Sequence, residues 1–160
     1  MTRWGRINLG LGVLAIALIL ADNWPSTSAD ANPLTDLLPL EIDSIRVERG
    51  KRLTLAFERD RQDWRMTHPR DAAAEPARVA RLLAVATAPS AHCRPASDDM
   101  AVFGIDPPAA VLQLGSLRLA FGDREATQQA RYVRVGNQVC VIDDAWFHLL
   151  ALPASHFAQD

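Results

Sequence analysis

Apolar and polar residues alternate in several short runs after residue 41, and each run predicts a β-strand. From Arg52 to Arg59, large apolar side chains occupy every second position at Leu53, Leu55 and Phe57, which is the period of a strand with one buried face. Short glycine-containing turns join such runs in pairs. The pattern therefore predicts three antiparallel hairpins, at residues 41–59, 110–121 and 131–142.

Two further strands and two helices complete the predicted domain. Strands are expected at Trp64–His68 and Ser90–Pro95. From residue 75 to 88, apolar residues recur at the spacing of one helix face, after a proline that suits a first turn. A last helix is expected after Asp143 or Asp144, limited by Pro153. The fold class expected is α+β, with antiparallel hairpins and two short helices.

One short sequence recurs in two of the predicted hairpins. Leu53–Phe57 and Leu117–Phe121 both read Leu-x-Leu-Ala-Phe, and each is the second arm of its hairpin. Each is followed by a strand led by an aromatic residue, Trp64 or Tyr132, and then by a helix. A duplicated ββ(β)α unit explains this order. Chance similarity between alternating strands is the alternative.

The N-terminus has the pattern of a membrane segment. An apolar run, Ile7–Ala21, follows Arg3 and Arg6 and is bracketed by Trp4 and Trp24. A helix from residue 4 to residue 24 would be about 31 Å long, enough to cross the bilayer core. Basic residues before the segment favour a cytoplasmic N-terminus. We therefore expect residues 1–24 to be a transmembrane anchor that contacts the lipid bilayer through residues 4–24.

A cleaved signal peptide is the alternative for the same segment. Cleavage after Ala21 would place Ile19 at the −3 position, where small residues are preferred. Better sites, after Ala29 or Ala31, lie far from the apolar run. The sequence thus favours an uncleaved anchor, and a processed N-terminus between residues 22 and 32 would overturn this expectation.

The rest of the chain divides into a tether and one exported domain. Residues 25–40 are rich in proline and small polar residues, which favours an extended tether. Residues 41–160 are expected to form the domain. From Asp22 onward the chain carries 19 acidic and 15 basic residues, a mildly acidic balance that argues against nucleic-acid binding. The expected location is the bacterial inner membrane, single-pass, with the domain in the periplasm.

Two cysteines, Cys93 and Cys140, suit an oxidising compartment. A bond between them would close a long loop and stabilise the fold by about 4 kcal/mol in the chain-entropy picture. Two separate buried thiols are the alternative. A Cα–Cα separation above about 7 Å would exclude the bond.

No motif assigns a catalytic, cofactor or metal residue. The four histidines do not show the i, i+4 spacing of a helical zinc site, and neither acidic pair, Asp98-Asp99 or Asp143-Asp144, belongs to a calcium loop. Three aromatic residues are candidates for an interaction surface: Trp64, Tyr132 and Trp146. We expect no cofactor and no metal.

Several short motifs together resemble the bacterial family called domain of unknown function 4340. They are Trp64-x-Met66-x-x-Pro69 before a helix, Phe103-Gly104-Ile105-x-x-Pro108, Phe121-Gly122, and Arg131-Tyr132-Val133-Arg134 before the strand 139–142. The family's usual Tyr-Gly-Leu is replaced here by Phe103-Gly104-Ile105. The resemblance runs from about Ile42 to the C-terminus. It implies a domain tethered by an N-terminal membrane helix, in some cases encoded beside transporter and gliding-type components, and it implies no catalytic residue.

These observations favour a membrane-anchored, non-enzymatic accessory module that binds an envelope protein in an envelope or transport assembly. One alternative is an envelope hydrolase or metal-dependent enzyme using His68, His92 or Asp98. Another is a periplasmic domain that binds a small ligand or glycan through Trp64, Tyr132 and Trp146, which requires these rings to be exposed.

Overall fold

The computed structural model describes residues 32–97, 99–126 and 129–159. The predicted anchor at 1–24 and the first part of the tether lie outside the described residues. Within the described ranges, no helix is both long and apolar enough to cross a bilayer.

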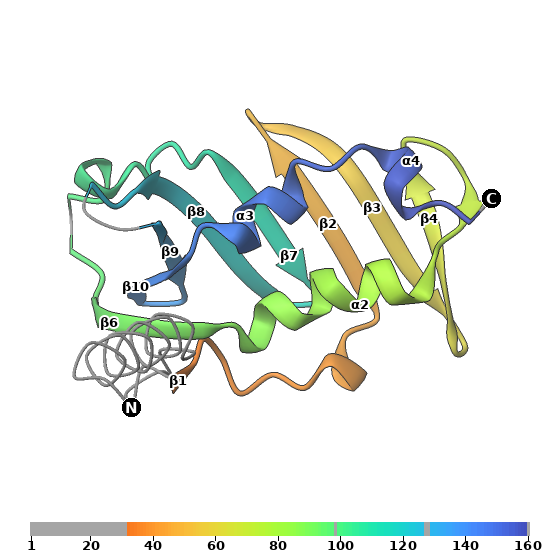
Figure 1. The fold of residues 1–160 in the computed structure, drawn as a ribbon, viewed down its shortest axis with the longest axis horizontal. Coiled ribbons are helices and arrows are strands. Elements are labelled where there is room, and N and C mark those ends of the chain that lie inside the picture. The colour runs from red at the N-terminus through yellow and green to blue at the C-terminus, as the bar shows by residue number, and fades with distance from the viewer. Residues whose placement is uncertain (1–31, 98, 127–128, 160) are drawn as a thin grey trace, which may run out of the picture.

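Ten strands form one antiparallel sheet in the order β1-β6-β10-β9-β8-β7-β2-β3-β4-β5 (Figure 1). The α+β class is thus confirmed, and all three predicted hairpins are present. Their bounds are β1 Asn32–Pro33, β2 Ser44–Arg49, β3 Arg52–Asp60, β4 Asp63–His68, β5 Ala72–Ala73, β6 Pro89–Pro95, β7 Ala110–Leu114, β8 Leu117–Arg124, β9 Ala130–Val135 and β10 Gln138–Asp143.

Helices cover one face of the sheet, the face toward the viewer in Figure 1. They are α2 (Pro76–Ala84), continued by the 3₁₀ turn η2 (Val85–Thr87), then α3 (Ala145–Leu150) and α4 (Ala154–Phe157). The predicted apolar stripe of α2 is buried against the strands. The predicted last helix ends at Leu150, and α4 begins only after Pro153, whose extended backbone separates the two.

The sheet consists of two halves that meet at its centre. β2 pairs with β7, and Val47 lies opposite Leu112 in that pair. Outward from this centre, β3 and β4 on one side match β8 and β9 on the other. Each half is followed in the chain by a helix, α2 after β5 and α3 after β10.

Each half is also completed by a segment that follows the helix of the other half. β6, which follows α2, pairs with β10 at the outer side of the second half. Ala158, which follows α4, forms a bridge with Ala74, next to β5 in the first half. This exchange ties the two halves together at both ends of the sheet as well as at its centre.

Part of the predicted tether belongs to the fold. Asn32 and Pro33 pair with β6, and Leu34 is buried in the main core. The backbone N–H groups of Leu34 and Thr35 donate to the carbonyls of Ala88 and Ala86. Residues 32–40 therefore pack on the domain, ahead of the expected domain start at 41.

The second face of the sheet is covered over its second half by the segment 99–108. Met100 and Ile105 from this segment bury Ala120 and Val139 in a second apolar cluster. The backbone of the segment lies so close to β8 that a Cβ on Gly122 would be 2.1 Å from the carbonyl oxygen of Phe103. The motifs Phe103-Gly104-Ile105 and Phe121-Gly122 thus meet in space, and glycine permits the contact.

Replacing Gly122 with alanine should destabilise the domain, because the new methyl group collides with backbone that has nowhere to move. We expect a loss of about 2–3 kcal/mol in the free energy of unfolding. Gly136→Ala is the matched control, since Gly136 has a φ of +54° but open space around it, and only the left-handed backbone costs about 1 kcal/mol. Urea unfolding of the full chain, followed by tryptophan fluorescence, measures both. Equal losses would contradict the close approach.

Candidate functional site

A groove of about 600 Å³ lies at one end of the sheet, between β6, the end of β10 and the start of α3. Its walls are mainly apolar, and Trp146 on α3 lies half-buried in one of them. Polar groups reach it from Ser90, Gln129 and Asp143. Concave apolar surfaces with a few polar groups are typical of binding sites.

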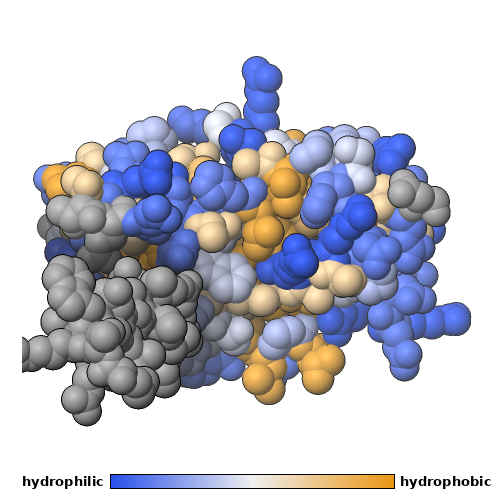
Figure 2. All heavy atoms as spheres, in the orientation of Figure 1, coloured by the Kyte–Doolittle hydropathy of each residue, from blue (hydrophilic) through white to orange (hydrophobic). Residues whose placement is uncertain are grey.

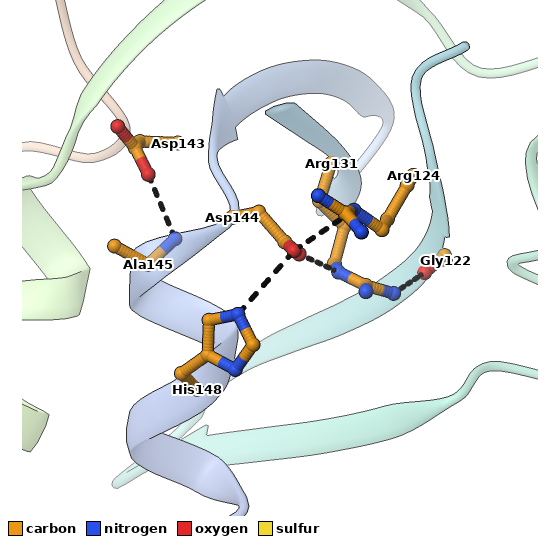
Figure 3. Close-up of polar contacts among 7 residues, drawn as sticks. All are labelled: Gly122, Arg124, Arg131, Asp143, Asp144, Ala145 and His148. Atoms are coloured by element: carbon orange, nitrogen blue, oxygen red, sulfur yellow. Dashed lines mark hydrogen bonds and ion pairs between the residues drawn. The ribbon is translucent and has the colours of Figure 1, made fainter. Parts of the chain in front are cut away.

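A buried ion pair fixes the helix that forms one wall of this groove. Arg131 on β9 donates from Nε to Oδ1 of Asp144 at 2.6 Å, and from Nη1 to the carbonyl of Gly122 (Figure 3). Arg131 and Asp144 are 8% and 4% exposed. Because a charge is buried at low cost only when it is paired and hydrogen-bonded, the start of α3 is held against β8 and β9.

The first turn of α3 adds two more contacts. Asp143 accepts a hydrogen bond from the backbone N–H of Ala145 at 2.7 Å, which satisfies a donor that the helix leaves free. The ring of Phe147 lies 3.7 Å from the guanidinium carbon of Arg131, a cation–π contact. α3 is short, so these contacts rather than its length determine where it lies.

Two exposed basic side chains complete the cluster around Asp144. Arg124 Nε lies 3.0 Å from Oδ2 of Asp144, and His148 Nε2 lies 3.6 Å from the same oxygen. The carboxylate is thus engaged at both oxygens by basic groups. Asp144 is therefore the centre of a structural clamp that links β8, β9 and α3.

A disulfide joins two of the strands that line the groove. Cys93 on β6 is joined to Cys140 on β10, with Cα atoms 4.0 Å apart. The β6–β10 pairing shifts register between Val139 and Val141, the two neighbours of Cys140. His92 has a φ of +51° at this bulge, which turns the backbone so that Cys93 meets Cys140.

The three aromatic residues singled out from the sequence lie in different places. Trp64 is buried on the helix-covered face, where Arg59 stacks on its ring at 4.9 Å. Tyr132 lies on the opposite face against Phe103, with ring centroids 5.0 Å apart. Trp146 lines the groove. The three rings thus do not share one binding surface.

The polar residues considered for catalysis are scattered too. His68 lies on β4 and His92 on β6, with six strands between them, which at the usual strand spacing is about 34 Å. Asp98 lies outside the described residues. Within those residues, no group of three or more histidine, cysteine or acidic side chains could hold a metal ion. No common site joins His68 with His92.

One exposed ion pair contrasts with the buried one. Arg65 and Asp71 form two hydrogen bonds between their side chains, at 2.5 and 2.6 Å. These bonds from Arg65 hold the pKa of Asp71 below its usual range. The associated stability is present above the unfolded-state pKa and is lost as pH falls through the lower folded-state pKa. Because both groups are in water, this contribution is small.

Fold and site together define an antiparallel sheet domain with helices on one face and a groove at one edge. Comparison with protein-family models shows that the chain belongs to the family described as "Domain of unknown function (DUF4340)", which matches residues 64–159. The matched region contains α3, the Arg131–Asp144 pair and both cysteines. Comparison with curated proteins and with solved structures finds no match.

The sequence contained a signal for the buried ion pair that its motifs did not reveal. Arg131 shares the alternation of Val133 and Val135, which face the core. A charged residue at a core-facing position requires a buried partner. Asp144 was expected only as a helix cap, although the predicted hairpin at 131–142 already brings the end of β10 beside Arg131.

Asp144→Ala should destabilise the domain strongly, since it leaves Arg131 buried without a counter-charge. We expect a loss of about 3–5 kcal/mol in the free energy of unfolding, measured by urea unfolding at neutral pH. Asp71→Ala is the matched control and should produce little change. The double variant Arg131→Met, Asp144→Leu should recover most of the loss, because no unpaired charge remains. A small effect of Asp144→Ala, similar to that of Asp71→Ala, would contradict the clamp.

Proposed function

We propose that this chain is a membrane-anchored accessory module, facing the periplasm, that binds a segment of an envelope or transport protein in the groove beside Trp146. The observation that carries the proposal is the groove itself, an apolar hollow with a half-buried tryptophan at one wall. Tryptophan is enriched among the residues that contribute most to protein–protein affinity.

The chemistry of the groove favours a polypeptide partner. Its volume of about 600 Å³ accommodates a few apolar side chains. Gln129 and Asp143, both exposed, supply donors and acceptors at its margin, as expected of an interface with an apolar centre and a polar rim. A partner segment that places one or two apolar side chains beside Trp146 would match this arrangement.

The walls of the groove are held in place before any partner arrives. The Arg131–Asp144 pair fixes α3, and the Cys93–Cys140 bond fixes β6 to β10. A site that is already ordered loses less conformational entropy on binding. Rigid walls are therefore consistent with a binding role.

Anchoring is supported by the N-terminal sequence. Arg3 and Arg6 precede the apolar run 7–21, and Trp24 follows it, which favours a segment held in the inner membrane with its basic end in the cytoplasm. A tethered domain meets partners in the same membrane at a raised effective concentration. The tether is thus part of the proposed function.

We also infer that the two halves of the sheet descend from one duplicated ββ(β)α unit. The central pairing of β2 with β7, the matched order of strands outward from it, and the exchange of β6 and Ala158 support this. Sequences of other family members, aligned half against half, provide the test. Repeats should align Phe57 with Phe121 and Met66 with Val133, and the absence of any such correspondence would count against duplication.

Site-specific photo-crosslinking in bacterial membranes tests the binding proposal. A photoreactive amino acid at position 146 of the full chain should give a discrete adduct with an envelope protein. The same residue at Val102, which is 69% exposed on η3 (Ala101–Phe103), should not. No specific adduct from position 146 in a stable chain, or the same adducts from both positions, would contradict the proposal.

A charge placed in the groove should then weaken the complex. Ala145→Glu puts a carboxylate in the groove wall while suiting the first turn of α3, and we expect the Kd for the captured partner to rise about tenfold or more. Ala77→Glu, at an exposed alanine in the first turn of α2, is the matched control and should leave the Kd unchanged.

A further inference from the structure

Two leucines of one short turn are exposed to solvent. Leu38 and Leu40 are 58% and 84% exposed, on and beside the 3₁₀ turn η1 (Pro39–Glu41). Figure 2 shows an apolar patch at the lower edge of the molecule, below α2, where Figure 1 places this orange turn. Single exposed leucines are common, but two on the same turn form a small apolar projection.

The turn that carries them is held firmly by polar contacts. Arg59 on β3 donates from Nη1 to the carbonyl of Leu40 at 3.0 Å and from Nη2 to the carbonyl of Pro39 at 3.2 Å. The carboxylate of Glu41 accepts from the backbone N–H of Leu38 at 3.3 Å. Arg59 and Glu41 thus order a turn on which Leu38 and Leu40 remain largely outside the core.

The position of the turn limits what it can meet. Asn32 follows Trp24 by eight residues, so β1 lies within about 28 Å of the end of the proposed anchor. η1 follows β1 closely in the chain, and both lie on the lower side of the molecule in Figure 1. If the anchor spans the membrane as proposed, this turn lies within reach of the bilayer surface.

We propose that Leu38 and Leu40 insert into the periplasmic interface of the bilayer and dock the domain in one orientation on the membrane. This rests on the proposed anchoring. Two leucines contribute too little area for a stable dimer, which needs about 800 Å² from each partner. An already tethered domain requires only weak additional binding to be held against the surface.

The charges around the turn indicate which force would hold it on the membrane. Asp36, Glu41 and Asp43 are exposed beside it, so attraction to anionic headgroups does not contribute. Docking is apolar, and we expect it to occur without anionic lipid and not to be strengthened by it. This distinguishes it from the electrostatic binding that basic surfaces show.

Fluorescence of the full chain in phosphatidylcholine vesicles, with and without phosphatidylglycerol, tests the proposal. Leu40→Cys carries an environment-sensitive label, and Val102→Cys, also an exposed apolar position, is the matched control. Cys93 and Cys140 are bonded and do not react. The label at position 40 should emit at shorter wavelength and be quenched roughly threefold more by lipid-borne nitroxide than the label at 102.

The outcomes separate this inference from the proposed function. If the chain does not co-sediment with vesicles, the proposed anchoring is overturned and the docking with it. If it co-sediments but the label at position 40 stays in water, the docking alone is overturned. A third outcome is a label at position 40 whose emission shifts to shorter wavelength only when the number of protein copies per vesicle is raised, and which lipid-borne nitroxide does not quench. This would indicate contact between copies of the chain and would also overturn the docking.

Discussion

The pairing of β2 with β7 makes one sheet out of two halves. Without it, each half would expose a central edge whose unpaired N–H and C=O groups invite wrong strand pairing. The pair also places Val47 beside Leu112 in the core beneath the helices. The exchange of β6 and Ala158 between the halves depends on the same centre, because each segment reaches its partner only when the halves lie side by side. Helices, groove and covering segment all take their positions from this sheet.

Local patterns were enough to predict the hairpins, the strand at 64–68 and helix α2. Alternation identifies a strand, glycine marks the turn between two strands, and an i, i+3, i+4 stripe identifies a helix. Which hairpins are neighbours is a different matter. The β2–β7 and β6–β10 pairs join residues far apart in the chain, and no local period shows them. β1 and β5 have two residues each, too few to show any alternation.

The candidate groove was missed for the same reason, since its walls come from β6, β10 and α3. Trp146 was identified as an aromatic candidate, yet its neighbours follow from the long-range pairing. The recurring Leu-x-Leu-Ala-Phe sequence lies on β3 and β8, with Phe57 and Phe121 both in the core. It aligned Trp64 with Tyr132, whereas the strand registers place Arg131 in the position of Trp64. This position thus carries an aromatic side chain in β4 and, in β9, the cation that fixes α3.

The attachment of the N-terminal residues to the sheet has a mechanical consequence. Any pull on the chain from before Asn32 enters the domain at β1, where the hydroxyl of Ser90 donates to the carbonyl of Asn32 and Thr35 bonds to Ala86. β1 is the edge strand and passes the load to β6, which hydrogen bonds alone would hold only weakly to β10. The Cys93–Cys140 bond joins β6 covalently to β10, so the load continues into the interior of the sheet. β6, the strand that takes up the load from β1, is therefore the one held by a covalent bond.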